Sequence, residues 1–409
     1  MARSWVAGSA MGLGMTRLDP LSVATAHRLV ALRAQRAWRA TRPLSRGSYR
    51  LGRLVAAAFG AWQRYGEVGE PVAIHHGGDR YRDGQRRLLL VTQELSLSGA
   101  PRLLVEIAAI FARAGWLVTL VSPTDGPSRA AMKPHAAVIV DPTVLDERSP
   151  LMRRLRTATD LAICNTVLAD GAVCSLASRV PTLWYLHEVS LLAGLLETEP
   201  RTARALAAAR EVWAGSELSA ALVRPHRQDV RVRPYGVQPL PSVSPVAVPG
   251  QMDESPIRVA VFGAIEPRKG QDLAVAALAA LTIGERARVR LTLYGRVLDR
   301  SFATAVAAAA RTLPVSWGGE LTSVDYAAAM AATDVVLVSS RDDTLPLVSL
   351  DALGSGRVLM CTSGTGTSAW IEDGRSGFVA EADALHIACL LYTSPSPRDL
   401  STSRMPSSA

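Results

Sequence analysis

SSRDDTLPLVSLDALGSGRVLM (Ser339–Met360) is the stretch that decides the fold. A strand-forming run, DVVLVS, leads into it. A polar loop and a helix-compatible apolar segment follow, and glycines 354 and 356 then precede another apolar run. Strand, loop, short helix, glycine stop and strand is a βαβ step of a parallel sheet. Because such sheets bind ligands at the carboxyl ends of their strands, the loop with Asp343 and the helix with Asp351 form a candidate binding site.

The same alternation of buried strands and helices fills two halves of the chain. The first half begins with RLLLVTQ at Arg87, and the second begins with IRVAVFGA at Ile257. Between them, Gln238–Pro256 holds five prolines and no periodic pattern, which is typical of a linker. Short β-branched strands that alternate with helices predict parallel sheets. We therefore predict an α/β protein with two Rossmann-like, doubly wound domains facing a cleft in which a ligand would bind.

The two ends of the chain differ in composition from these domains. Residues 1–66 hold eleven arginines and a single acid, Asp19, whereas the last twenty residues are rich in Ser, Pro, Arg and Thr. This tail resembles translated vector or adapter sequence and interrupts an expected helix, so we expect the second domain to be truncated. The predicted organisation is a basic helical extension (1–85), an N-terminal domain (86–240), a linker (241–256), a C-terminal domain (257–389) and a non-native tail (390–409).

The basic N-terminal segment accounts for the net charge of +9, because charges nearly cancel over the rest of the chain. Residues 17–66 intersperse arginines among apolar residues, which predicts either a helix on an anionic membrane surface or a solvated extension. Few aromatic residues are interleaved, so nucleic acid is not an expected partner. The four cysteines lack metal-ligand spacing, and no apolar run is long enough to span a bilayer. We expect a cytoplasmic protein, either free or peripheral at the cytoplasmic membrane face.

Lys269 and two aspartates are the candidate binding residues of the second domain. Lys269 is one of only two lysines and, with Arg268, precedes a predicted helix. A phosphate could meet the free N–H groups of that helix start, although an exposed loop cation would give the same pattern. Asp343 and Asp351 stand eight positions apart and could accept hydrogen bonds from sugar hydroxyls. They could instead be an N-cap and part of a solvated helix face.

Six short motifs occur in the order expected for one family and cover most of residues 87–389. The segment from Asp343 to Asp351 resembles a Glu-x7-Glu signature with aspartate at both positions, and EPRKG resembles a donor-diphosphate lysine motif. SGAP resembles a Gly-rich loop after the first strand, WYLHE a mid-domain histidine motif, PYGV a domain-end turn and GRSGFV a closing strand. The chain thus resembles the retaining glycosyltransferases of family 4 (glycosyltransferase group 1), which have the GT-B fold.

This resemblance implies a hexosyltransferase that moves a sugar from a nucleotide-diphosphate sugar to a glycan, lipid-linked or other acceptor, as in polysaccharide biosynthesis. It implies retention and no metal or other cofactor. Lys269 would neutralise the diphosphate, Asp343 would bind the transferred sugar, and His187 would hydrogen-bond the sugar near the reacting carbon. Asp351 would bind the ribose hydroxyls. The remaining donor-binding residues would bring backbone or charge close to the donor: Gly99, Arg268, Leu345, Leu347, Gly364 and Gly366.

Some positions depart from the family, and other functions stay open. Ala264 stands where the family usually has an arginine, Ala369 stands where an acid is common, and each aspartate is one methylene shorter than glutamate. A GT-B protein that binds a nucleotide sugar or a partner without transferring sugar would share the architecture, as would a nucleotide-sugar epimerase. GTGTSA also fits the G-x-G-x-x-A dinucleotide pattern, which would indicate an NAD-dependent enzyme.

Overall fold

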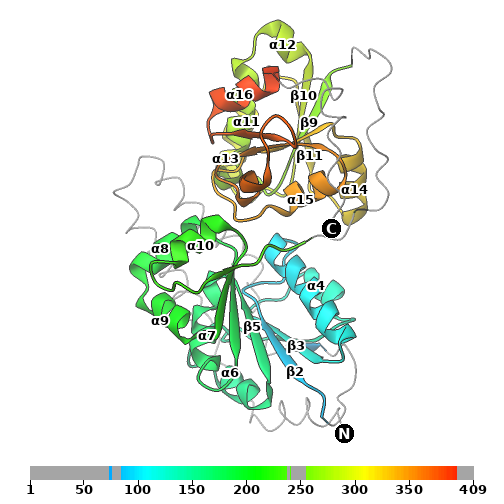
Figure 1. Ribbon diagram of the computed structural model, residues 1–409. Coiled ribbons are helices and arrows are strands. Elements are labelled where there is room, and N and C mark those ends of the chain that lie inside the picture. Colours follow the sequence, from blue (N-terminus) through cyan, green and yellow to red (C-terminus); the bar gives the residue numbers. More distant parts are fainter. Residues whose placement is uncertain (1–72, 76–83, 237–239, 241–254, 394–409) are drawn as a thin grey trace. The chain divides into compact units, whose positions relative to one another are not determined.

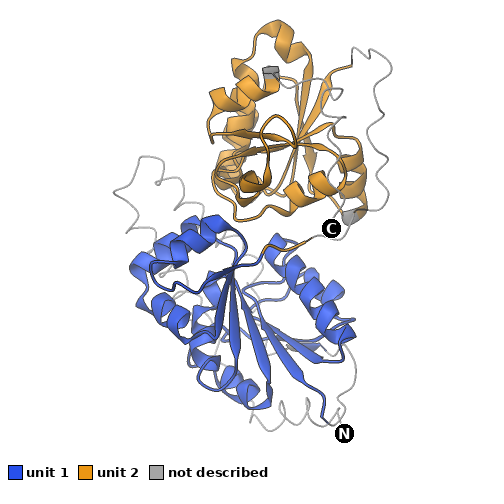
Figure 2. Cartoon of the chain, viewed as in Figure 1, with its two compact units in different colours: residues 1–48, 59–233 blue, residues 49–58, 234–409 orange. Residues whose placement is uncertain are grey.

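A computed structural model describes residues 73–75, 84–236, 240 and 255–393, which form two compact units (Figures 1 and 2). Described residues up to Arg233 belong to the first unit, and those from Pro234 belong to the second. Each unit is a doubly wound α/β sheet covered by helices, so the predicted fold class is confirmed. Most of the predicted basic extension, most of the linker and the tail beyond Thr393 lie outside the described residues.

The first unit is built on an eight-stranded sheet of order β1-β4-β3-β2-β5-β6-β7-β8, parallel except where β1 pairs with β4. Its strands are β1 (Ala73–His75), β2 (Arg87–Val91), β3 (Leu117–Ser122), β4 (Ala137–Val140), β5 (Leu161–Asn165), β6 (Thr182–Leu186), β7 (Glu211–Ala214) and β8 (Arg231–Val232). Its α-helices are α4 (Gly99–Arg113), α5 (Ser128–Met132), α6 (Pro150–Leu155), α7 (Asp170–Leu176), α8 (Ser190–Thr198), α9 (Pro200–Ala208) and α10 (Glu217–Val223).

The second unit is built on a six-stranded, wholly parallel sheet of order β11-β10-β9-β12-β13-β14. Its strands are β9 (Ile257–Phe262), β10 (Val289–Tyr294), β11 (Val315–Gly319), β12 (Val335–Val338), β13 (Val358–Thr362) and β14 (Phe378–Ala380). Its α-helices are α11 (Gln271–Ala280), α12 (Ile283–Ala287), α13 (Arg300–Ala309), α14 (Ser323–Ala331), α15 (Leu347–Gly354) and α16 (Ala384–Thr393). Short 3-10 turns cover Arg156–Ala158, Val167–Ala169, Pro267–Lys269 and Gly366–Trp370.

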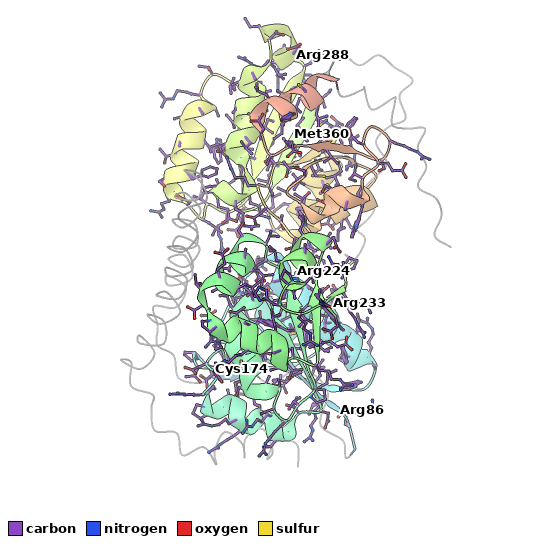
Figure 3. The ribbon with its side chains drawn as sticks, turned by 60° about the vertical axis from the view of Figure 1, so that its left-hand side comes forward. Arg86, Cys174, Arg224, Arg233, Arg288 and Met360 are labelled. Atoms are coloured by element: carbon purple, nitrogen blue, oxygen red, sulfur yellow. The ribbon has the colours of Figure 1, made fainter. Side chains whose placement is uncertain are left out.

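Burial on both faces explains why these strands are continuous apolar runs. In β2, Leu89 and Val91 pack into one core cluster, and Leu88 and Leu90 pack into another on the opposite face. Helices cover both faces of a parallel sheet, so apolar residues face both sides of a central strand such as β2. The same pattern makes Met360 of β13 an interior residue of the second unit, 1% exposed (Figure 3).

Helix α16 extends further than the composition of the chain suggests. It runs to Thr393, and Leu391 packs into the core of the second unit with 8% of its surface exposed. The first residues of the predicted non-native tail therefore continue a helix of this unit. Within the described residues, no helix combines the length and apolar character needed to cross a membrane.

The strand order marks where each sheet would bind a ligand. In the first sheet β2 lies between β3 and β5, and in the second β9 lies between β10 and β12, so connections leave these strands in opposite directions. Ligands of doubly wound sheets bind at such a switch point, outside the carboxyl ends of the strands. Lys269 follows β9, and Asp343 follows β12. The candidate residues of the second unit therefore lie at its switch point.

Candidate functional site

Two cations meet one carboxylate at the switch point of the second unit. Lys269 ends a 3-10 turn after β9, and its Nζ donates a hydrogen bond to Oδ2 of Asp343. Nη1 of Arg268 lies 3.6 Å from the same oxygen, while Nη2 of Arg268 donates to Oε1 of Glu266 at 3.0 Å. We call these four residues, Glu266, Arg268, Lys269 and Asp343, the lysine cluster. It contains two acids and two bases.

Neighbouring charges keep Asp343 and Arg268 ionised despite their burial. Burial alone would raise the pKa of the Asp343 carboxyl, but Lys269 and Arg268 outweigh burial and hold that pKa below its ordinary value. Burial also opposes the charge of Arg268, yet Glu266 and Asp343 raise the pKa of its guanidinium. The carboxyl of Asp343 and the guanidinium of Arg268 are therefore both charged at neutral pH.

A glycine brings the Lys269 loop against the end of β12. Gly270 has a left-handed backbone (φ +67°), and a Cβ there would lie 1.9 Å from the carbonyl oxygen of Ser339. Two hydrogen bonds join the same segments: Oγ of Ser339 donates to the carbonyl of Lys269 at 3.0 Å, and the N–H of Arg341 donates to the carbonyl of Arg268 at 2.8 Å. This contact sets how close Lys269 lies to Asp343.

The loop after β13 completes this part of the site. The N–H of Asp343 donates to the carbonyl of Gly364 at 3.0 Å, and the N–H of Gly366 donates to the carbonyl of Asp343 at 2.9 Å. A Cβ on Gly364 would lie 2.3 Å from the carbonyl oxygen of Arg341, so only glycine fits there. Asp343 thus joins the loops after β9, β12 and β13 through its side chain and its backbone.

Asp351 lies in a different environment from Asp343. It is only 2% exposed on α15, and its Oδ2 accepts a hydrogen bond from the hydroxyl of Tyr326 at 2.8 Å. The Tyr326 ring packs edge-on against Phe262, which stacks on Tyr294 with centroids 4.9 Å apart. The two aspartates therefore have separate partners: Asp343 pairs with cations, and Asp351 is held beside an aromatic group.

The start of α15 lies directly after this loop. Leu345 is buried, and its carbonyl accepts a hydrogen bond from the hydroxyl of Tyr235 at 2.6 Å. Pro346 occupies the N-cap, so it contributes no N–H, and Leu347 is the first helical residue. First-turn N–H groups such as that of Leu347 have no carbonyl partner within the helix. The N–H of Ser349 donates to the carbonyl of Pro346 at 3.0 Å, so the N–H of Leu347 is the first-turn donor that we consider for an anion.

His187 is the centre of the candidate residues in the first unit. It follows β6, and its Nε2 lies 2.6 Å from Oδ1 of Asn165 at the end of β5. Nδ2 of Asn165 donates to the carbonyl of Ala100 at 3.2 Å, beside the exposed Gly99 that begins α4. Burial lowers the pKa of His187 to about 3, so its ring is neutral at pH 7. One amide thus connects His187 to the segment that carries Gly99.

A carboxylate fixes the backbone around His187. Oε2 of Glu188 accepts hydrogen bonds from the N–H of His187 and from that of Val167, both at 3.0 Å. The hydroxyl of Ser219 on α10 donates to the carbonyl of Glu188 at 2.9 Å. The ring of Tyr185 lies 4.4 Å from the His187 ring, centroid to centroid. His187 therefore sits on a segment held by β5, β6 and α10.

Two families match this chain, one in each unit. The family "Glycosyl-transferase family 4" matches residues 84–192, and "Glycosyl transferases group 1" matches residues 256–391. With one match in each unit, the chain is a group 1/family 4-like glycosyltransferase. None of the curated proteins compared matches it.

Solved structures of glycosyltransferases have the same two-domain fold. HepE of Anabaena in complex with UDP and glucose is 19% identical with a TM-score of 0.63, over 78% of this chain and 92% of that one. Sucrose-phosphate synthase of Thermosynechococcus elongatus is 18% identical with a TM-score of 0.62, over 78% and 93%. The lipopolysaccharide outer core galactosyltransferase WaaB is 15% identical with a TM-score of 0.58, over 78% and 95%. The predicted GT-B architecture is confirmed.

Three residues of this glycosyltransferase escaped the sequence analysis. Tyr326 was not singled out because it lies 25 positions before its partner Asp351. Arg341 is a second: its guanidinium binds both carboxylate oxygens of Asp272, at 2.8 and 2.7 Å, and so ties the loop after β12 to the start of α11. The third, Asn165, did carry a signal, because it is the only asparagine in the chain.

No cluster of three or more His, Cys, Asp or Glu side chains that could hold a metal ion occurs among the described residues.

Ala264 stands where the family usually has an arginine. No side-chain cation is available at that position, whereas the guanidinium of Arg268 lies beside the ammonium of Lys269 on Asp343. Arg268 therefore supplies a second positive charge within the lysine cluster.

Proposed function

We propose that this glycosyltransferase takes a sugar from a nucleotide-diphosphate sugar, bound through the lysine cluster, and transfers it to a glycan, lipid-linked or other acceptor. The observation that carries the proposal is the meeting of Lys269, Arg268 and Asp343 at the switch point of the second sheet. HepE, whose crystal structures contain UDP-glucose or UDP and glucose, supports a UDP-sugar as the donor.

The chemistry of the donor matches the chemistry of the cluster. A nucleoside diphosphate leaving group gathers negative charge as the glycosidic bond breaks, and preorganised cations at that place lower the barrier. Lys269 and Arg268 supply the positive charge, and Leu347 adds a helix-start N–H group. A carboxylate such as Asp343 accepts hydrogen bonds from sugar hydroxyls but repels phosphate. These are the roles we assign to the cluster.

The other assigned residues act on the ends of the donor and on the transferred sugar. We assign Asp351 to the ribose hydroxyls, Gly364 and Gly366 to close backbone approach, and Leu345 to the shape of the loop. Tyr326 holds Asp351 in place through its hydroxyl. In the first unit, the neutral His187 ring can hydrogen-bond the sugar without adding charge. Transfer with retention and without a metal ion completes the proposal.

Binding by the purified chain tests the donor assignment. The chain is titrated with UDP-glucose and with other UDP-, ADP- and GDP-sugars in the presence of EDTA. Lys269→Ala is compared with Lys133→Ala, which removes the only other lysine from an exposed position after α5. We expect wild type and Lys133→Ala to bind one nucleotide sugar equally, and Lys269→Ala to lose that binding.

The outcomes separate the alternatives. Equal binding by Lys269→Ala and wild type would remove the lysine cluster from the donor site. Binding of NAD without binding of any nucleotide sugar would indicate a dinucleotide enzyme instead. A protein that binds a nucleotide sugar but neither hydrolyses nor transfers it would be a binding protein, and conversion of the bound sugar to an epimer would indicate an epimerase. Donor binding that requires a divalent cation would contradict metal independence.

We also propose that residues 17–66 hold the enzyme at the cytoplasmic face of an anionic membrane. The support is the sequence of this segment, whose arginines are interspersed with apolar residues. Co-sedimentation with vesicles containing phosphatidylglycerol is measured for the full chain and for a variant that lacks residues 1–66. We expect binding by the full chain only, decreasing with salt. Equal sedimentation of the two proteins would contradict the anchor.

A further inference from the structure

Asn165 is the only asparagine in the 409 residues, and it is completely buried at the end of β5. Both ends of its side-chain amide are used. Nδ2 donates to the carbonyl of Ala100 at 3.2 Å, and Oδ1 lies 2.6 Å from Nε2 of His187. The amide therefore spans two segments that the chain separates widely: the first turn of α4 and the residue after β6.

The bond to Ala100 decides which way the amide faces. A carbonyl oxygen accepts hydrogen bonds and cannot donate, so the atom facing Ala100 is the NH2 group and the atom facing His187 is the oxygen. Oδ1 also only accepts, so the neutral ring of His187 carries its proton on Nε2. Nδ1 is then the accepting nitrogen of the ring. The orientation of one amide thus determines the tautomer of the histidine.

The backbone of Thr166, the residue after Asn165, is held by hydrogen bonds at both its N–H and its carbonyl. Thr166 has φ +73°, and it is the only residue other than glycine with a positive φ in the described part of the chain. Its N–H donates to the carbonyl of Tyr185, and its carbonyl accepts from Nε1 of Trp184, both at 2.8 Å. A β-branched residue keeps such a conformation only where its surroundings over-determine it. This anchoring fixes the position from which the Asn165 side chain reaches His187.

We propose that Asn165 is a positioning residue for sugar transfer, which holds His187 as the neutral Nε2–H tautomer and ties its ring to the start of α4. The inference rests on the role that the proposed function gives to His187. Asn165 acts through His187 and needs no contact with the substrate. Its function is to present a ring whose Nδ1 is the accepting nitrogen. We therefore expect loss of Asn165 to change the tautomer of His187 while the fold is retained.

The tautomer is measured directly on the full chain. Two-bond 1H–15N NMR spectra of protein labelled with 15N-histidine distinguish Nε2–H from Nδ1–H rings, and His187→Gln assigns the His187 signal among the seven histidines. We expect Nε2–H in wild type. In Asn165→Leu, which has a similar shape but no amide, we expect loss of this single tautomer.

Two further variants separate positioning from general damage. Thr182→Val removes a buried hydrogen bond at the opposite end of β6, from its hydroxyl to the carbonyl of Val180 (2.9 Å), and is expected to keep the tautomer. Asn165→Asp keeps an acceptor for Nε2–H but loses the donor to Ala100. It also adds a negative charge beside the ring, where Glu188 and Tyr185 are the titratable neighbours already described. It is expected to retain a proton on Nε2 and to protonate the ring at a higher pH than wild type.

Hydrolysis of UDP-glucose supplies the kinetic readout. We expect Asn165→Leu to lower kcat by about tenfold or more while the KM for UDP-glucose changes little, because misplacing a group that acts on the reacting sugar reduces turnover. Thr182→Val should keep both constants. Far-UV circular dichroism of each variant confirms that the fold is retained.

The inference fails if wild-type His187 is an Nδ1–H tautomer, or if folded Asn165→Leu keeps both the tautomer and kcat. These outcomes differ from a failure of the proposed function. If no nucleotide sugar binds, the NMR result still decides whether Asn165 sets the tautomer. If the tautomer depends on Asn165 but His187→Gln retains full activity, then the assigned role of His187 is wrong.

Discussion

Replacement of Gly270 by alanine tests the contact that places Lys269 beside Asp343. The added Cβ would lie 1.9 Å from the carbonyl oxygen of Ser339, whereas real Cβ atoms essentially never approach within 3.0 Å. The Cβ is bonded directly to the backbone and the group that it meets is a backbone carbonyl, so no flexible side chain can move aside. The Lys269 loop has to move away from the end of β12, and the lysine moves with it.

The magnitude follows from two terms. An alanine in the left-handed region costs about 1–2 kcal/mol. Separating the loop from β12 also breaks the bonds from Ser339 to Lys269 and from Arg341 to Arg268. Each is worth about 1 kcal/mol, so Gly270→Ala should destabilise the second unit by about 3–4 kcal/mol in total. Gly374→Ala supplies the matched control, because Gly374 has φ +75° but nothing within 4 Å of its added Cβ. It should lose only the first term, about 1–2 kcal/mol.

Hydrogen–deuterium exchange along a urea titration measures the result, because peptides from the second unit report its unfolding separately from that of the first. UDP-glucose binding is measured on the same proteins below the unfolding transition. We expect Gly270→Ala to be the less stable variant and to bind the donor more weakly than Gly374→Ala. Equal losses of stability in the two variants would refute the close approach, and unchanged donor binding would show that this approach does not set the position of Lys269.

Further substitutions test individual contacts of the site. In Asp343→Asn the stability lost relative to wild type should be largest at neutral pH. It should shrink as the pH falls through the lowered pKa of Asp343, as thermal melts between pH 7 and pH 3 would show. The same variant should bind free UDP more tightly than wild type in calorimetric titrations, because Lys269 is released from its carboxylate. Tyr326→Phe removes the hydroxyl bound to the buried Asp351 and should destabilise the second unit by about 1.5–3 kcal/mol in urea unfolding. Arg341→Ala should lower stability by only about 1 kcal/mol, since its ion pair is partly exposed, but should weaken UDP-glucose binding measurably by loosening the loop after β12 that carries Asp343.

The two parallel sheets were predictable because each central strand is buried on both faces. Runs such as RLLLV and VVLV have no polar face, which is the pattern of a strand between two helical layers. The proximity of Lys269 to Asp343 could also be predicted from the sequence. Both follow strands whose carboxyl ends adjoin at the switch point, so a parallel sheet brings them together across 74 positions.

The environment of Asp351 was not predictable in the same way. Spacing alone suggested two similar carboxylates along one segment, but spacing says nothing of which neighbours the other elements bring. Tyr326 comes from α14, and its position depends on how its ring packs against Phe262 of β9. Asn165 illustrates the same limit, since its effect on His187 arises from a tertiary contact with Ala100. Residues that act through another side chain leave little trace in a motif.

The charge balance of the lysine cluster bears on how the site would use its donor. Glu266 and Asp343 offset Arg268 and Lys269, so the lysine cluster has no excess positive charge to attract a diphosphate. A donor that brings phosphate to Lys269 must therefore separate it from Asp343. A free diphosphate would leave that carboxylate part-buried without its cation, which is unfavourable. A sugar attached to the diphosphate changes the balance, because its hydroxyls can donate to the released carboxylate. The ion pair between Lys269 and Asp343 would then favour binding of a complete nucleotide sugar over binding of the bare nucleotide. Asp343 forms this ion pair although its side chain is one methylene shorter than the glutamate of the family.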